Sequence, residues 1–237
     1  MLSIKKLNQY YGDSHTLWDL DFNVERGTCT CLMGRNGVGK TTLLKCIMGL
    51  LPARSGVIEF NGQDISQLPA EHRAKMRIGY VPQGREIFSR LTVEENLRVG
   101  LASQKSLASR GSSSKDIPNL VFELFPVLKE MLQRRGGDLS GGQQQQLAIG
   151  RALAVNPTLL ILDEPCEGIQ PNIVSLIGDI ITKLNKEMDV TVLLVEQKIG
   201  FTQKIATNFC IMEKGRNVVA DDISALSDDL ISEYLVV

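Results

Sequence analysis

The strongest chemical signal in the chain is a glycine-rich loop. The pattern G-x-x-x-x-G-K-[ST] is matched without a gap by Gly34-Arg35-Asn36-Gly37-Val38-Gly39-Lys40-Thr41, between a short apolar strand and a helical segment. Glycines let successive backbone N–H groups turn toward phosphate oxygens, and the positive N-terminal end of the following helix adds to the attraction. Lys40 is expected to reach the β- and γ-phosphates, and the Thr41 hydroxyl to bind Mg²⁺. The loop, extended to Thr42, therefore predicts a nucleotide phosphate site.

Two carboxylates form the second chemical signal. Asp163 and Glu164 directly follow the apolar run Leu159–Leu162, which is typical of a buried strand. Ligands of open parallel sheets bind at the carboxyl ends of the strands. We expect Asp163 to hold Mg²⁺, directly or through water, and Glu164 to polarise the attacking water as a general base. Beside a phosphate loop, this pair predicts ATP hydrolysis with Mg²⁺.

A third signal is a second helix start suited to an anion. Leu139-Ser140-Gly141-Gly142-Gln143 combines a serine cap, two glycines and the beginning of a helix. Ser140, Gly141, Gly142 and Gln143 therefore predict a second anion-binding helix end, with a plain glycine turn before a helix as the alternative.

The elements that position these residues alternate between strand and helix patterns. This alternation predicts an α/β fold with a parallel sheet and crossover helices. Strand patterns cover residues 3–7, 17–24, 28–33, 56–61, 77–82, 159–162, 190–195 and 209–212, the last taken as the final core strand. Helical patterns cover residues 41–51, the segment from Thr92 with a Thr92–Glu95 capping box, 119–134, 141–155, 173–188 and a helix ending at 205–206.

One domain with an inserted helical subdomain is predicted. The nucleotide-binding α/β core is assigned to residues 1–83 and 135–237, and the helical subdomain to 84–134, where the polar stretch 103–114 is expected to be a flexible connector. Trp18 is assigned to the core, and the glutamines 143–146 to a solvated or interface face.

Bulk composition narrows the class of protein. The 237 residues carry a formal net charge of -1, which argues against binding nucleic acid through a general basic surface. The five cysteines lie mostly in apolar runs without ligand spacing, which indicates buried thiols rather than a zinc site. We see no signal peptide and no run of about 18 apolar residues, so we expect no membrane span.

With LSGGQ between the phosphate loop and the Asp-Glu pair, nearly the whole chain resembles the ABC-type ATPases. The resemblance implies a P-loop core with an N-terminal antiparallel β subdomain and a helical insert, using ATP and Mg²⁺. It implies that Tyr11 stacks on adenine and that Gln83 touches Mg²⁺ or water. It also implies that two such domains pair head to tail, with ATP between Lys40 of one and the Ser140 segment of the other. Residues 167–171 then cross the interface.

Two positions depart from that family's pattern. Most members place a histidine after the strand corresponding to 190–195, where this chain has Gln197. We expect the Gln197 amide to hydrogen-bond the γ-phosphate without supplying a positive charge, so that it joins Glu164 and Lys40 as a catalytic residue. Cys166 replaces a small hydroxyl residue, and we interpret it as a structural cysteine, with a redox role as the alternative.

Within the family, segments 80–88, 91–97 and 164–171 resemble the importers of branched-chain amino acids and of urea or amides. The segment Gly168-Ile169-Gln170-Pro171 favours the urea importers. The resemblance implies a cytoplasmic subunit held at the inner face of the cell membrane by permease subunits, served indirectly by a solute-binding protein. It implies a second ABC ATPase partner, with a heterodimer expected and a homodimer open, and no nucleic acid.

Several other classes of protein are alternatives. A branched-chain amino acid importer ATPase and a non-transport ABC ATPase are the nearest alternatives. A P-loop kinase or GTPase would not explain LSGGQ, and no Asn-Lys-x-Asp motif is present. Intact Lys40, Asp163 and Glu164 argue against a non-enzymatic ATP-gated adaptor.

Overall fold

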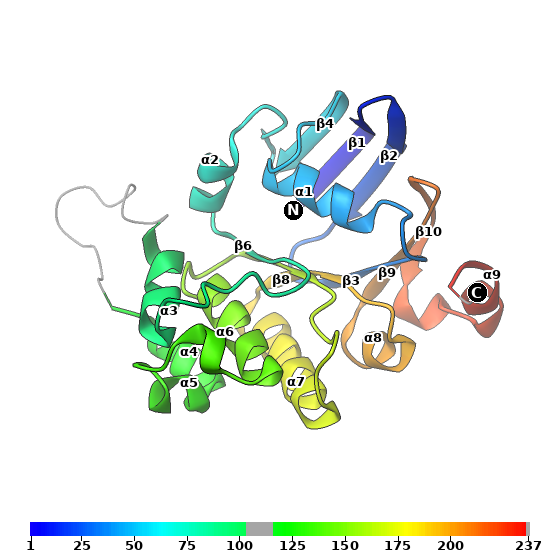
Figure 1. Ribbon diagram of the computed structural model, residues 1–237. Helices are drawn as coiled ribbons and strands as arrows, with labels where there is room; N and C mark the ends of the chain where they lie inside the picture. Colours follow the sequence, from blue (N-terminus) through cyan, green and yellow to red (C-terminus); the bar gives the residue numbers. More distant parts are fainter. Residues whose placement is uncertain (103–115, 236–237) are drawn as a thin grey trace.

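The computed structural model describes residues 1–102 and 116–235, and Figure 1 shows two sheets with helices between and below them. The predicted connector 103–114 lies outside the described residues. The upper sheet is antiparallel, in the order β2-β1-β4-β5. Its strands are β1 (Leu2–Tyr11), β2 (Ser14–Val24), β4 (Ser55–Phe60) and β5 (Gln63–Asp64).

The second sheet has the order β10-β9-β3-β8-β7-β6, and every neighbouring pair except β9–β10 is parallel. The strands are β3 (Cys29–Met33), β6 (Ile78–Val81), β7 (Leu159–Asp163), β8 (Thr191–Val195), β9 (Asn208–Glu213) and β10 (Arg216–Asp222). Taking β9 as the final strand was wrong. β10 returns beside it at the sheet edge, and its largely exposed polar residues give no buried-strand pattern.

The helices lie mainly below the parallel sheet (Figure 1). They are α1 (Lys40–Met48), α2 (Ala70–Lys75), α3 (Val93–Ala102), α4 (Asn119–Leu124), α5 (Pro126–Glu130), α6 (Gly141–Leu153), α7 (Pro171–Met188), α8 (Ile199–Ile205) and α9 (Asp228–Tyr234). The Thr92–Glu95 capping box is confirmed by reciprocal hydrogen bonds of 3.1 and 2.7 Å. The helical pattern over 119–134 contains two short helices, because α4 ends at Leu124 and Pro126 begins α5. The short α2 was not predicted.

Two apolar clusters occupy the two faces of the parallel sheet. Leu160 and Leu162 of β7 pack with the helices below, whereas Leu159 and Ile161 pack with α1 and the antiparallel sheet above. All five cysteines are buried, as expected. Placing Trp18 in the core was wrong. It is 40% exposed, because Leu17 and Leu20 take the inward positions of β2.

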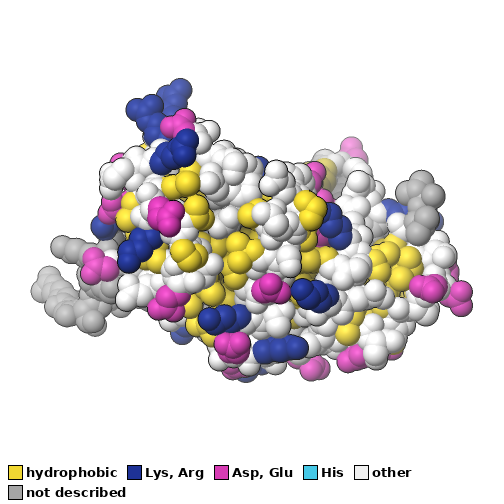
Figure 2. Space-filling model, turned by 90° about the horizontal axis from the view of Figure 1, so that it is seen from below, with side chains coloured by type: hydrophobic (Ala, Val, Ile, Leu, Met, Phe, Trp, Pro, Cys, Tyr) yellow, Lys and Arg dark blue, Asp and Glu magenta, His cyan; other side chains and the backbone are white. Residues whose placement is uncertain are grey.

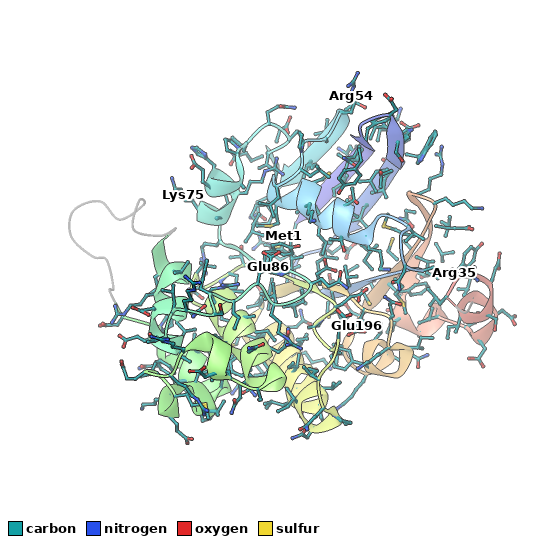
Figure 3. The ribbon with its side chains drawn as sticks, in the orientation of Figure 1. Met1, Arg35, Arg54, Lys75, Glu86 and Glu196 are labelled. Carbon is teal, nitrogen blue, oxygen red and sulfur yellow. The ribbon has the colours of Figure 1, made fainter. Side chains whose placement is uncertain are left out.

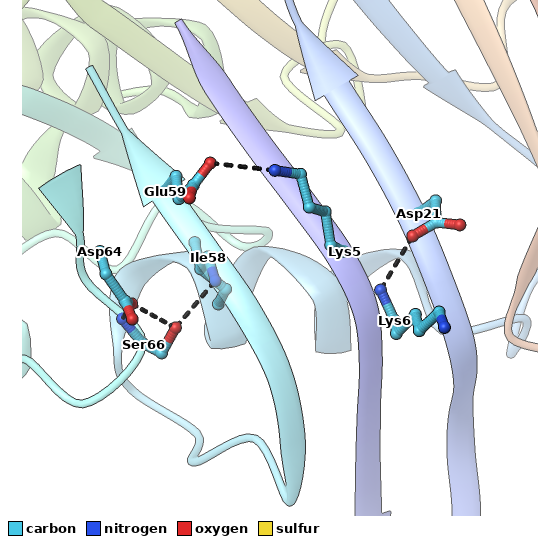
Figure 4. A network of polar contacts seen from close by, with 7 residues as sticks. All are labelled: Lys5, Lys6, Asp21, Ile58, Glu59, Asp64 and Ser66. Atoms are coloured by element: carbon cyan, nitrogen blue, oxygen red, sulfur yellow. Dashed lines mark hydrogen bonds and ion pairs between the residues drawn. The ribbon is translucent and has the colours of Figure 1, made fainter. Parts of the chain in front are cut away.

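Polar contacts connect the strands of the antiparallel sheet, in which β1 ends at Tyr11 (Figure 4). Lys5 of β1 pairs with Glu59 of β4 at 3.4 Å, and the Lys6 N–H donates to the Asp21 carboxylate of β2 at 2.8 Å. The Ser66 hydroxyl donates to Asp64 at 2.6 Å. These contacts are exposed and each contributes little stability, and those of Lys5 and Lys6 link β1 to its two neighbouring strands.

Among residues 1–102 and 116–235, none of the helices combines the length and the apolar composition needed to cross a bilayer. Figure 2 views the helical layer from below and shows apolar side chains in the middle of this face, with acidic and basic side chains interspersed.

Candidate active site

The glycine-rich loop connects β3 to α1 in a conformation that requires glycine. Gly34, Gly37 and Gly39 have φ angles of 143°, 81° and 109°, where side chains are disfavoured. A Cβ on Gly34 would also overlap the Met212 carbonyl, and one on Gly39 would lie 2.9 Å from the Leu17 side chain. Gly39 caps α1 without a side-chain hydrogen bond, so the first N–H groups of the helix remain available to an anion.

Lys40 is buried within this loop. Its Nζ donates to the Gly34 carbonyl at 2.7 Å and to the Arg35 carbonyl at 2.9 Å. Burial lowers the pKa of Lys40, while the nearby carboxylates of Glu164 and Asp163 oppose that shift. The ammonium group is therefore desolvated and directed back across the loop that is expected to enclose the phosphates.

Asp163 ends β7 and is 1% exposed. Burial raises its pKa to about 6, against the opposing effect of the Thr41 hydroxyl beside it. Neither carboxylate oxygen has a hydrogen-bond partner of normal geometry within the described part of the chain. An unpartnered buried carboxylate is costly by itself, so this environment fits a group that completes its coordination with a cation.

Glu164 follows Asp163 in a left-handed backbone conformation with φ 49°, unusual for a residue with a side chain. Its N–H donates to the Val195 carbonyl of β8 at 2.9 Å. One carboxylate oxygen accepts from Gln197 Nε2 at 2.6 Å, and the other from Gln83 Nε2 at 3.3 Å. Two amide side chains therefore hold the proposed base from either side.

Gln197 also reaches the phosphate loop. Its Nε2 donates to Asn36 Oδ1 at 2.8 Å as well as to Glu164. The position predicted from the missing histidine thus lies beside the base and the loop. Its predicted contact with the γ-phosphate stays a prediction.

A cavity of about 450 Å³ brings half of the predicted site residues together, and Asp163 and Gln197 are not among the residues that line it. Tyr11 lies at its edge, 49% exposed, with its hydroxyl 3.5 Å from Thr42 Oγ1. The lining also includes Thr16 and Glu167, which the sequence did not single out as site residues. The full lining is Tyr11, Thr16, Asn36, Gly37, Gly39, Lys40, Thr41, Thr42, Gln83, Glu164 and Glu167.

Three residues of the loop motif do not line this cavity. Gly34 is buried, and the Val38 carbonyl accepts from the Gly215 N–H at 3.0 Å. Arg35 extends to α9, where Nη2 donates to the Glu233 carbonyl at 3.4 Å (Figure 3). The loop pattern alone does not distinguish these supporting positions from the lining ones.

The Ser140 segment lies at a separate cavity. Ser140 caps α6 with a capping box, in which the Gln143 N–H donates to Ser140 Oγ at 3.3 Å and the Ser140 N–H to Gln143 Oε1 at 2.9 Å. Residues 140–143 line a cavity of about 590 Å³ with Gly168, Ile169 and neighbours, and it shares no lining residue with the first. A solvated face was wrong for Gln145 and Gln146, which are 3% and 4% exposed, and Gln146 also lines this second cavity.

One supporting residue was missed by sequence reasoning. Glu196, at the end of β8, is 3% exposed and accepts from the N–H groups of Cys166, Gln197 and Lys198 at 3.2, 2.8 and 3.0 Å. Lys198 Nζ donates to the Cys166 carbonyl at 2.9 Å. A charged residue directly after a buried strand was the available signal. Burial raises the pKa of Cys166, which makes its thiol a poor nucleophile and supports the structural interpretation.

Comparison with known proteins identifies the class that this fold and site define. The family model described as ABC transporter matches residues 17–167. The chain is 43% identical over 226 residues to the high-affinity branched-chain amino acid transport ATP-binding protein BraG of Pseudomonas aeruginosa, covering 95% of this chain and 94% of BraG. It is 38% identical over 216 residues to the probable branched-chain amino acid transport ATP-binding protein LivF of Archaeoglobus fulgidus, covering 91% and 89%.

A solved dimeric structure of a bacterial ABC transporter cassette superposes with a TM-score of 0.83 and 25% identity, covering 94% of this chain and 99% of that one. The chain therefore belongs to the ABC transporter family. It has the P-loop ABC ATPase fold, with the antiparallel β subdomain and the helical insert, and it is an ATP-hydrolysing cassette.

Proposed function

We propose that this chain is the ATP-hydrolysing subunit of a membrane importer. The observation that carries the proposal is the single cavity in which the phosphate loop, Gln83 and Glu164 meet, with Asp163 buried beside Thr41. BraG and LivF, which align over nearly the whole chain, are branched-chain amino acid transport ATP-binding proteins by name, and they support an importer.

In this proposal the cavity holds the phosphates of ATP. Backbone N–H groups from Gly37 to Thr41 and the Lys40 ammonium bind the oxygens, while Tyr11 stacks on the adenine at the open edge. Glu164 accepts the proton of the attacking water, and Gln83 and Gln197 fix the orientation of its carboxylate. The water oxygen bonds to the γ-phosphorus as the bond to the β–γ bridging oxygen breaks, giving ADP and phosphate.

The donor set near Thr41 fits Mg²⁺. The unpartnered oxygens of Asp163, the Thr41 hydroxyl and the Gln83 side chain are the hard oxygen donors that this cation prefers. When bound, Mg²⁺ neutralises charge on the β- and γ-phosphates.

The two separate cavities support a shared site. Because the Ser140 segment does not line the phosphate cavity of its own chain, we propose that it binds the ATP of a second ABC ATPase arranged head to tail. Segment 167–171 would lie at that interface. ATP then favours the closed pair, and loss of the γ-phosphate favours the open pair. The solved dimeric cassette supports pairing, and a heterodimer with a related ATPase remains our preferred form.

The membrane partners belong to the same proposal. A separate permease would hold this chain at the inner face of the cell membrane and receive the movement of the helical subdomain, which we assign to residues 84–134. A solute-binding protein would deliver the cargo to the permease.

Two cargo classes are proposed. The names of BraG and LivF favour branched-chain amino acids, while the segment Gly168–Pro171 favours urea or a small amide. Uptake of labelled leucine and labelled urea by cells with and without the gene for this chain separates the two. Uptake of both solutes unchanged by the deletion would contradict both assignments.

Steady-state hydrolysis tests the catalytic part. The purified chain should release phosphate from ATP, and Glu164→Gln should lose turnover while retaining ATP binding and forming an ATP-dependent dimer on gel filtration. Unimpaired turnover by Glu164→Gln would remove Glu164 as the base. Absence of a dimer, alone and with candidate partner ATPases, would contradict the shared site.

A further inference from the structure

The side chains on either side of Gly84 both contact Glu167, and each also donates to one other residue. Gln83 Nε2 donates to the carboxylates of Glu164 at 3.3 Å and Glu167 at 3.2 Å. Arg85 Nη2 donates to the Glu167 carbonyl at 3.3 Å, and its Nη1 to Gln144 Oε1 on α6 at 3.4 Å. The path from Glu164 to α6 therefore runs through three consecutive residues of one loop.

The backbone of this loop also lies along α6. Arg151 Nη2 donates to the Arg85 carbonyl at 3.2 Å, and its guanidinium lies 5.2 Å from the ring centre of Phe88. Gln144 and Arg151 are seven residues apart, so they lie on the same face of the helix. Arg85 is thus attached to α6 at two levels, by its side chain and by its carbonyl.

Arg85 lies in a loop with an unusual backbone conformation, and two glycines lie close to its guanidinium. Gly84, Arg85 and Glu86 have φ angles of 76°, 72° and 44°, three successive residues in a region that side chains rarely adopt. In Figure 3 the Glu86 label marks this loop near the parallel sheet. A Cβ on Gly141 would lie 3.3 Å from Arg85 Nη1, and one on Gly168 3.7 Å from Nη2. The guanidinium therefore lies between the first turn of α6 and the loop after Cys166.

We propose that Arg85 is a positioning residue that couples the phosphate site of this chain to its own Ser140 segment. A shift of Gln83 at Glu164 moves Gly84 and Arg85, and the planar guanidinium transmits this movement to Gln144 and to the Glu167 backbone together. The Ser140 end of α6 then changes position with the state of the first site. This inference rests on the proposed function, in which that end binds the ATP of the second subunit.

The test compares Arg85→Ala and Arg85→Lys with the exposed control Arg90→Ala, all in the Glu164→Gln background. The first readout is hydrogen exchange of residues 140–144 in dilute monomer, with and without MgATP. We expect ATP to change this exchange in the parent and in Arg90→Ala, and to lose that effect in Arg85→Ala. Lysine has one charged group in place of the planar fork, so Arg85→Lys should recover less than half of the effect.

The second readout is the ATP concentration needed for dimer formation. Arg85→Ala should raise it about tenfold, the order of a typical coupling between sites, while the Kd of the monomer for a fluorescent ATP analogue changes less than about twofold. Exchange and dimerisation of Arg85→Ala equal to those of the parent would overturn the proposal. A loss of nucleotide affinity and thermal stability as large as the loss of dimerisation would also overturn it, because it would indicate a purely structural role.

The two readouts separate this inference from the proposed function. An Arg85-dependent exchange change in a chain that forms no dimer would retain the coupling and contradict the self-pairing. An ATP-dependent dimer that is indifferent to Arg85 would retain the shared site and contradict the coupling.

Discussion

Replacing Asp163 by Asn is expected to stabilise the Mg²⁺-free and nucleotide-free chain while abolishing ATP turnover. Burial raises the pKa of this carboxyl from 3.8 to about 6. A carboxyl whose pKa is higher in the folded chain binds protons more tightly when folded, so its ionisation opposes folding as pH rises. The penalty is absent below about pH 3.8, grows between 3.8 and 6, and is complete above that range.

The size of the effect follows from the two pKa values. A rise from 3.8 to about 6 is roughly 2 units, and at ~1.4 kcal/mol per unit it corresponds to about 3 kcal/mol at pH 7. Asn keeps nearly the same shape without a charge, so Asp163→Asn should recover an amount of this order. At pH 5 the folded carboxyl is mostly protonated, and linkage reduces the gain to roughly half.

Urea unfolding in EDTA at pH 7 and pH 5, followed by circular dichroism, measures both values. Asp179→Asn is the matched control, because that carboxylate is 66% exposed and pairs with Lys204 at 3.3 Å, so its loss should change stability by less than about 1 kcal/mol. An Asp163→Asn chain less stable than the parent at pH 7, or a gain that does not shrink at pH 5, would refute the reasoning. Retained ATP turnover would remove Asp163 from the site.

Three further changes test neighbouring contacts. Gln197→Ala removes a hydrogen bond to the Glu164 carboxylate at an exposed position, so kcat should fall about tenfold with KM nearly constant; unchanged steady-state turnover would reject this role. Tyr11→Ala should raise the KM for ATP several-fold and Tyr11→Phe should not, and equal KM values for both would argue against adenine stacking. Arg73→Leu removes a donor from four backbone carbonyls, of which that of Cys46 also accepts from the Gly49 N–H, and should lower the free energy of unfolding by about 3 kcal/mol; an unchanged urea midpoint would contradict that estimate.

The elements that could be predicted from the sequence are those whose burial is visible as a local apolar pattern. Strands β3, β7 and β8 are buried along their whole length, and each consists mainly of apolar residues and is followed by glycine or glutamate. Strand β10 exposes most of its residues, and the only buried residue of helix α2 is Arg73, so both lack that pattern because their positions are fixed by contacts with distant segments.

The residues of the site were predictable to different degrees. Lys40, Asp163 and Glu164 follow from spacing alone, because a phosphate loop and the carboxyl end of a strand specify their own geometry. The turn of Arg35 toward α9 depends on the packing of the C-terminal helix, and the contacts of Arg85 depend on a left-handed loop. Neither has a local signature in the sequence, so only the folded chain shows them.

An apolar strand followed by a glutamate occurs at two neighbouring strand ends, and the two glutamates have different hydrogen-bond partners. Glu196 after β8 is buried and accepts from three backbone N–H groups, so its lone pairs already serve the structure. Glu164 after β7 is half-buried and accepts from two side-chain amides at the edge of a cavity. Side-chain amides can rotate away when a water arrives, whereas the backbone donors of Glu196 cannot move without distorting the loop. The hydrogen-bond partners therefore distinguish the proposed base from its structural neighbour.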